Sequence, residues 1–301
     1  MGAPMAVLID QPRWPAHGTV FGHLVSDSSL DELHAFAAAA GLSWRAFDHD
    51  HYDVPLARYE SLIDAGAEPV AERELVTRLT AGGLRVRARD KSPGRAQALT
   101  LAVADWARLG LANQLRDELL ERWSEPHRHY HDVRHLANTL AALDRLGPAG
   151  RSVRLAVWFH DAVYAGVAGR DEEHSASLAQ ARLSGLLEPT EVSRIASLVR
   201  MTANHQPIDD EEALLSDADL SVLGLSRARY DVYVRDVRTD YEHVDDESWR
   251  LGRTAVLDDL LARPRIFHTA AGTALWGTAA RANLLAERRR WAGAGILQFG
   301  E

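Results

Sequence analysis

Helical spacing runs almost unbroken through the last two-thirds of this chain of 301 residues. Beyond the segment Asp90-Lys91-Ser92-Pro93-Gly94, apolar residues recur every three or four positions, as on one face of an α-helix. The stretches between are short and carry Gly or Pro, as at Gly147-Pro148 and Glu188-Pro189. The pattern predicts helices over 96–123, 132–146, 151–163, 172–187, 190–203, 210–223, 227–241, 247–262 and 274–290. We therefore expect an all-helical domain over residues 93–301.

The first 92 residues have a different pattern, which predicts a small α/β domain. Three short stretches are typical of strands: 6–9, 43–47 and 84–87. Two stretches have helical spacing: one follows Ser28-Ser29 and ends at Gly41, and the other covers 69–79 and ends at Gly82-Gly83. The predicted fold class is thus mainly α, with a small α/β domain over residues 1–92 in front of the helical domain.

The composition excludes several classes of protein. There are no cysteines, which excludes disulfides, zinc–thiolate sites and cysteine nucleophiles. The net charge is -9, so we expect no extended nucleic-acid binding, although a small nucleotide in a local pocket is compatible. No stretch reaches the roughly 18 apolar residues of a membrane span, and the first residues lack the features of a signal peptide. We expect a cytoplasmic protein without membrane contact.

Histidines and aspartates recur in the predicted helical domain at positions that suit a metal site. His135 opens one helical run, and His160-Asp161 end the apolar run 155–159. Asp219 lies on a later predicted helix, two residues after Asp217. Buried charges need a partner or a metal, and helical bundles build metal sites from such inward-facing residues. Nitrogen and oxygen ligands without sulfur suit Mn, Mg, Fe, Co, Ni or Zn.

Residues 100–290 resemble the HD phosphohydrolase superfamily, and within it the subfamily of predicted metal-dependent HD phosphohydrolases. The motifs that carry the resemblance are Glu125-Pro126-His127-Arg128-His129-Tyr130-His131-Asp132, Trp158-Phe159-His160-Asp161, Asp171-Glu172-Glu173, Thr202-Ala203-Asn204-His205 and Asp217-Ala218-Asp219-Leu220. The resemblance implies that His135, His160, Asp161 and Asp219 bind one or two divalent metal ions. Asp219 is preferred to Asp217 because Ala218-Asp219-Leu220 is similar to the Ala-Asp-Arg-Leu segment of related enzymes.

His131 is a candidate general acid. Tyr130-His131-Asp132 followed by His135 resembles the Tyr-His-Asn-x-x-His segment of cyclic nucleotide phosphodiesterases, whose first His protonates the leaving oxygen. On a helix His131 and His135 would share a face. The alternative is that His131 only hydrogen-bonds a helix end. Asp161 is expected to act in catalysis through the metal, because a bound divalent cation lowers the pKa of its water toward ~7.

Further residues are candidates for binding the substrate or a second ion. Arg128, Arg134 and Arg253 suit a phosphate group, since guanidinium forms forked hydrogen bonds with it. Asp217 is expected beside the ligands, and His205, Glu173 and His174 are the residues available for a second metal or for the substrate. The alternative for each arginine is an ordinary surface ion pair.

The first domain resembles a small uncharacterised bacterial domain of unknown function. The segments that carry this resemblance are 10–18, 23–27 and 48–55. Their polar residues form either a second polar or metal site or a set of turn and capping residues: Asp10, His17, His23, Asp48, Asp50, His51 and Asp53. A domain that selects the substrate or regulates the enzyme is equally compatible with them.

The leading expectation is a metal-dependent hydrolase that cleaves a phosphate ester, on a nucleotide or another small phosphorylated metabolite. One alternative is a di-iron oxygenase, which needs further histidine ligands such as His174 and His205. Another is a non-catalytic nucleotide-sensing protein that regulates a partner through the first domain. A homo-oligomer is compatible with every one of these readings.

Overall fold

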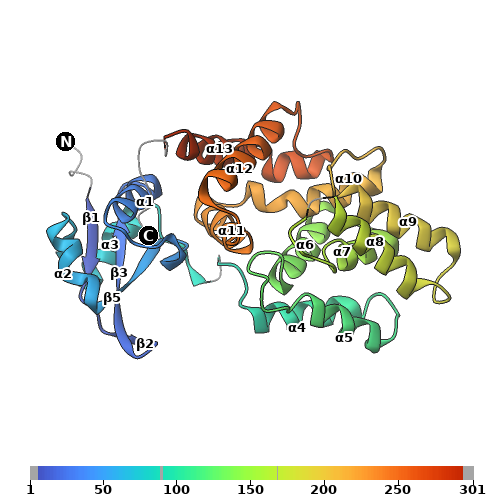
Figure 1. Cartoon of the computed structure of the whole chain (residues 1–301), viewed down its shortest axis with the longest axis horizontal. Helices are drawn as coiled ribbons and strands as arrows, with labels where there is room; N and C mark the ends of the chain where they lie inside the picture. Colours follow the sequence, from blue (N-terminus) through green and yellow to red (C-terminus); the bar gives the residue numbers. More distant parts are fainter. Residues whose placement is uncertain (1–5, 89–90, 168, 294–301) are drawn as a thin grey trace. The chain divides into compact units, whose positions relative to one another are not determined.

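The computed structural model describes residues 6–88, 91–167 and 169–293. The chain divides into two compact units after Lys91, and Arg227–Arg235 cluster with the first unit rather than with the helices that precede them in sequence. The first unit holds the sheet and the second is helical (Figure 1), which confirms the predicted fold class. Among the described residues, no helix combines the length and the apolar character needed to cross a membrane.

The sheet of the first unit has six strands: β1 (Val7–Asp10), β2 (Trp14–Ala16), β3 (Thr19–Ser26), β4 (Phe47–Asp48), β5 (His51–Pro55) and β6 (Glu68–Val70). Their order is β4-β5-β3-β1-β6, and β2 pairs with β3. β1 runs parallel to β6 and antiparallel to β3. β3 also pairs antiparallel with β5, which places His23 opposite Asp53.

Helices cover both faces of this sheet: α1 (Leu30–Ala39), α2 (Leu56–Asp64) and α3 (Glu72–Ala81). Side chains alternate between the two faces of a strand. Ile9 of β1 therefore packs on the same side as Leu33 of α1 and Leu62 of α2. Its neighbour Leu8 packs on the other side with Leu75 of α3. Both faces of β1 are buried, which explains its continuous apolar run.

Two predicted strands of the first unit are wrong. Residues 43–47 form a 3₁₀ turn, Trp44–Ala46, because the Ser43 hydroxyl accepts a hydrogen bond from the Arg45 amide and curls the chain. In this part of the chain the strand is limited to Phe47–Asp48, which pairs with β5. Residues 84–87 are not a strand either, since the Val86 amide donates to the Asp50 carboxylate instead of to a neighbouring strand. The strands β2, β3 and β5 and the helix α2 were not predicted, and the start of the predicted helix over 69–79 belongs to the strand β6.

The helices of the second unit are α4 (Arg95–Trp106), α5 (Asn113–Arg122), α6 (Val133–Leu146), α7 (Arg151–Phe159), α8 (Arg170–Leu183), α9 (Pro189–Met201), α10 (Asp210–Asp219), α12 (Asp246–Ala262) and α13 (Ala270–Gly293). α11 (Arg227–Asp240) contributes Asp236 onward to this unit. The predicted helix over 96–123 is two helices, because Gly110 takes a left-handed conformation (φ +69°) in the connection. The stretch after Asp219 continues as a 3₁₀ turn, Leu220–Gly224.

α7 is the central helix of the second unit. Every residue from Val153 to His160 is buried, and the helix packs against α6, α8, α9 and α10. A helix that is apolar on all sides belongs in a core. Its burial carries the polar residues Arg154 and His160 into the interior, where both need partners.

Arg154 lies in a buried polar network. Its guanidinium donates to the carboxylate of Asp105, which also accepts from Trp158 Nε1 at 3.1 Å. A second Arg154 nitrogen donates to Asp144 at 2.5 Å. Asp105 is buried with Arg154, whereas the Asp144 side chain is 48% exposed. The two acids therefore compensate the same cation from very different environments.

This difference predicts unequal effects on stability. We expect Asp105→Ala to lower the free energy of unfolding by about 3–5 kcal/mol, because it leaves a buried guanidinium without its buried partner. Asp144→Ala is the matched control and is expected to cost no more than about 1 kcal/mol, since that carboxylate is half exposed. Urea unfolding of both variants measures the difference. Equal losses would contradict this account of the network.

Candidate metal centre

Three helices of the second unit bring four predicted ligands together. His135 lies in the first turn of α6, which begins where the Asp132 side chain accepts a hydrogen bond from the Arg134 amide. His160 and Asp161 follow α7 directly, and Asp219 is the last residue of α10. α6, α7 and α10 pack against one another. The centre therefore forms where the buried helix ends between its two neighbours.

The Nε2 atom of each histidine lies within a few ångströms of both carboxylates. His135 Nε2 is 2.9 Å from Asp219 Oδ1 and 3.6 Å from Asp161 Oδ2. His160 Nε2 is 3.1 Å from Asp161 Oδ2 and 3.5 Å from Asp219 Oδ1. The side chains of Asp161 and Asp219 retain 15% and 13% exposure, so an ion and a water molecule can reach a cluster whose histidines are buried.

The protonation of His160 explains why this donor set fits a cation. Its Nδ1 lies 2.8 Å from the Val157 carbonyl, which can only accept a hydrogen bond, so Nδ1 carries the proton. In the neutral ring Nε2 then offers a lone pair, and it lies 3.1 Å from Nε2 of His135. Two lone pairs and two carboxylates facing one another repel unless a cation or a proton lies between them. The four residues thus fit a divalent metal ion with mixed nitrogen and oxygen ligands.

The charges of the cluster shift the pKa values of its members. Burial alone would lower the pKa of His160, but the carboxylates of Asp161 and Asp219 outweigh it and raise this pKa well above its usual value. Burial would likewise raise the pKa of Asp161 and of Asp219, yet the histidines hold both pKa values below the usual range. Without metal, the cluster therefore keeps a proton on His160 at neutral pH.

His131 lies beside the centre and is paired with an aspartate that sequence reasoning missed. Its Nδ1 is 2.8 Å from Oδ2 of Asp240, whose side chain is completely buried. Asp240 also accepts hydrogen bonds from the amides of His129, Tyr130 and His131 at 2.5, 3.2 and 3.2 Å. His131 is close enough to Asp161 that its ring contributes, after His160, to lowering the pKa of that carboxyl. Because 109 residues separate His131 from Asp240, no local motif links them.

Arg128 is buried behind the centre, where it binds backbone carbonyls instead of being exposed to a substrate. Its side chain is completely buried and donates to the carbonyls of His131, Asp161 and Ala162 at 3.1, 2.6 and 3.2 Å. The guanidinium also lies 5.4 Å from the ring of Tyr164, which stacks on His131 at 4.3 Å. This placement does not support the expected phosphate contact: Arg128 ties the backbone at His131 to the backbone at Asp161 and Ala162.

Two other predicted substrate-binding residues also have structural partners. Arg134 donates to the Asp132 carboxylate at 3.0 Å and to the His129 carbonyl, so it braces the segment that carries His131. Asp217 is buried and accepts from the amides of His268 and Thr269 at 2.7 and 2.8 Å, at the start of α13. A Cβ atom on Gly272 would lie 2.3 Å from the Asp217 carboxylate, so this turn requires glycine.

His205 lies at the edge of the centre. Its Nε2 is 3.5 Å from Oδ2 of Asp219, and its Nδ1 is 3.2 Å from the Ser216 hydroxyl. Its backbone is left-handed (φ +52°), a conformation that costs a non-glycine residue about 1 kcal/mol. Burial lowers the pKa of His205, so the ring is neutral at physiological pH and can act as a further ligand or as a contact for the substrate.

Three predicted candidates lie away from the centre. Glu173 forms an exposed ion pair with Arg200 at 2.6 Å, and His174 is exposed on the same helix, α8. Arg253 is buried in an ion pair with Glu287 at 2.8 Å, between α12 and α13. The first pair is on the surface and the second fastens two helices, so neither supports the expected role in binding substrate or metal.

Comparison with known sequences reaches only the first unit. A family profile described as a protein of unknown function (DUF4031) matches residues 7–82, which agrees with the expected small domain of unknown function. No curated protein and no solved structure matches the chain. The relationship of the second unit to the HD phosphohydrolases therefore stays a prediction from its motifs.

The raised pKa of His160 predicts that metal binding releases a proton. A metal ligand must be a neutral imidazole, so the ion has to displace the proton that Asp161 and Asp219 hold on His160. The apparent affinity should rise with pH by about tenfold per pH unit for each displaced proton, and level off above the pKa of His160. Calorimetric titration with Mn²⁺ in two buffers of different ionisation enthalpy counts the protons.

His160→Gln separates this effect from other proton release in the chain. The variant is expected to lose the part of the released protons that belongs to this centre, whereas His174→Gln, an exposed histidine of α8, should leave it unchanged. Equal proton release by the wild-type protein and by His160→Gln would show that His160 is not a ligand.

Proposed function

We propose that the second unit is a metal-dependent phosphohydrolase, which hydrolyses a phosphate ester of a nucleotide or of another small phosphorylated metabolite. The observation that carries the proposal is the convergence of His135, His160, Asp161 and Asp219 beside the His131–Asp240 pair. Such a site combines a place for a divalent cation with a positioned proton donor. Phosphate as the reactive group rests on the sequence resemblance of residues 100–290.

The residues of this centre divide the work of hydrolysis. His135, His160, Asp161 and Asp219 would hold a divalent cation, which would make water a stronger nucleophile near neutral pH and offset charge on phosphoryl oxygens. His131 protonates the leaving oxygen as general acid, since its side chain is 20% exposed. Asp240 holds the proton on Nδ1 and stabilises the imidazolium, so the other nitrogen faces the substrate in its protonated form.

The histidines around the centre favour hydrolysis over oxygen chemistry. A di-iron oxygenase of this type needs further histidine ligands between His160-Asp161 and Asp219. His174 is exposed on α8, which leaves His205 as the one histidine in that interval that contacts the cluster among the described residues. A sensor without turnover would have no need for the His131–Asp240 pair. We therefore favour the hydrolase.

The proposal predicts activity that depends on the ligands. The purified protein should hydrolyse bis(p-nitrophenyl) phosphate, p-nitrophenyl phosphate or members of a nucleotide panel in the presence of Mn²⁺, Mg²⁺, Co²⁺ or Ni²⁺. His160→Ala and Asp161→Ala should each reduce this activity by at least about 100-fold, because removing a ligand removes the cation. His174→Ala is the control and should retain wild-type rates. Activity that survives both ligand substitutions would refute the proposal.

The His131–Asp240 pair predicts a separate effect on turnover. Asp240→Asn should lower kcat by about 10²–10⁴-fold, the usual worth of a general acid, while metal affinity stays close to that of the wild type. The loss should be smaller for a substrate with a good leaving group, such as a p-nitrophenyl ester, than for an alkyl ester. Asp246→Asn, an exposed residue of the neighbouring helix, is the control. An equal loss with both leaving groups would argue against acid catalysis by His131.

A further inference from the structure

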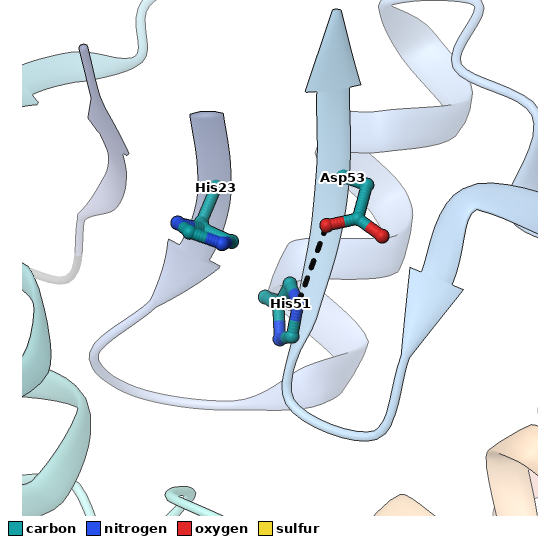
Figure 2. A group of neighbouring side chains, drawn as sticks. All are labelled: His23, His51 and Asp53. Atoms are coloured by element: carbon teal, nitrogen blue, oxygen red, sulfur yellow. Dashed lines mark ion pairs between the residues drawn. The ribbon is translucent and has the colours of Figure 1, made fainter. Parts of the chain in front are cut away.

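We propose that the first unit binds a divalent transition-metal ion of its own, through His23, His51 and Asp53. These residues lie on the adjacent strands β3 and β5, where His23 is directly opposite Asp53. His51 precedes Asp53 by two positions, so both side chains lie on one face of the sheet. Figure 2 shows the two imidazoles and the carboxylate turned toward one another.

The three side chains are close enough to share one ion. One candidate ligand atom from each lies within 4.8 Å of the other two. His51 Nε2 is 3.5 Å from Asp53 Oδ1, and the rings of His23 and His51 meet edge to face with centroids 5.0 Å apart. Neighbouring strands hold all three positions, so the spacing is fixed by the ladder of the sheet.

Two buried carboxylates orient the two imidazoles. Asp10 Oδ2 is 3.0 Å from His23 Nδ1, and Asp50 Oδ1 is 2.8 Å from His51 Nδ1. Both aspartates have completely buried side chains. A carboxylate on one ring nitrogen holds the proton there and leaves the other nitrogen as a lone-pair donor, which is the arrangement of most histidine metal ligands. Here it occurs twice, on histidines that face each other.

A backbone hydrogen bond and a neighbouring glycine fix the position of Asp10 beside His23. Asp10 Oδ1 accepts a hydrogen bond from the His23 amide at 2.6 Å, so the carboxylate grips both the backbone and the ring of the same residue. A Cβ atom on Gly22 would lie 2.6 Å from the Asp10 carbonyl and 2.9 Å from its carboxylate. Glycine at this strand position is therefore required for the approach of Asp10 to His23.

The charge of the cluster matches a divalent cation. Asp10, Asp50 and Asp53 contribute three negative charges, and Arg85 offsets one through its contact with Asp50 at 3.0 Å. Two negative charges then lie around the two imidazoles. The same field acts on His51: burial would lower its pKa, but hydrogen bonds with Asp50 and Asp53 raise that pKa to about 9.

The ligand types select among metals. Two imidazole nitrogens and one carboxylate oxygen suit Zn²⁺, Co²⁺, Ni²⁺ or Fe²⁺ better than Mg²⁺ or Ca²⁺, which prefer oxygen. Three protein ligands leave at least one position of the ion open. The side chains of His23 and Asp53 are 26% and 49% exposed, so water or a small anion can reach that position.

His17 and Asp48, the other two of the seven candidate polar residues of this domain, lie outside the cluster. His17 is exposed in the turn between β2 and β3. Asp48 pairs with His49 and with Lys91, at 2.6 Å in each case. Of the seven residues expected to form either a metal site or turns, the cluster thus takes Asp10, His23, Asp50, His51 and Asp53.

Cobalt binding to the full-length protein tests the site. Co²⁺ is added to metal-free protein, and the bound ions per chain are counted by elemental analysis together with the visible absorption of the coordinated cobalt. We expect His51→Gln and Asp53→Asn each to bind one ion fewer than the wild type. His17→Gln, an exposed histidine of the same unit, is the control and should bind the wild-type number. Unchanged stoichiometry in both cluster variants would overturn the proposal.

A second background separates this site from the metal centre of the helical unit. In His160→Ala/Asp219→Ala, one cobalt ion per chain should still bind, and adding Asp53→Asn should abolish that binding. Far-UV circular dichroism checks that each variant is folded, and the half-exposed Asp53 makes Asp53→Asn the least disruptive of them. The double variant failing to bind any cobalt while folded would equally refute a site in the first unit.

Discussion

Two carboxylates and two imidazoles converge in the interior of the helical unit, and the packing around them compensates for their burial. His160 is carried inside because α7 is buried on every side, so its position is a consequence of core packing. The Val157 carbonyl takes the proton of Nδ1, and the facing groups are His135, Asp161 and Asp219. A cation resolves the repulsion among these lone pairs. The position of His160 in the proposed metal centre is thus set by the packing of the core.

One buried arginine, Arg128, joins the backbone segment that carries His131 to the segment that carries Asp161. Arg128 binds backbone carbonyls on both sides of the site, and a carbonyl can accept these hydrogen bonds whatever side chain it carries. The same arginine lies over Tyr164, which stacks on His131. His131 is therefore held from one face by an aromatic ring and at Nδ1 by Asp240. Neither of these two contacts involves a proposed metal ligand, so separate mutations can test the proposed acid catalysis and the proposed metal binding.

The sequence was sufficient for what depends on local spacing. Most helices of the second unit follow the predicted ranges, because an amphipathic stripe and its caps are local properties. The sequence was not sufficient where contacts between distant residues determine the structure. Asp240 is 109 residues from His131, so no local motif predicts their contact. The sequence suggested that Arg128 binds phosphate, because nothing in it indicates that this side chain is completely buried. In the first unit, residues 84–87 alternate as a strand would, yet the Asp50 carboxylate takes the amide of Val86 and no ladder forms. Contacts between residues that are far apart in the sequence produce no periodic pattern of apolar residues, so the sequence alone does not predict them.

The two His/Asp clusters solve the same electrostatic problem in different ways. In the helical unit both carboxylates face the ion position directly, and the His160 ring is oriented by a neutral carbonyl. In the first unit one carboxylate faces the ion position, and two others stand behind the imidazoles. A carboxylate behind an imidazole raises the basicity of that ligand, so the first unit offers stronger nitrogen donors and fewer oxygens. It should therefore favour zinc or cobalt, whereas the oxygen-rich centre of the helical unit should accept manganese and magnesium more readily. Metal preference thus follows from where each cluster places its negative charge.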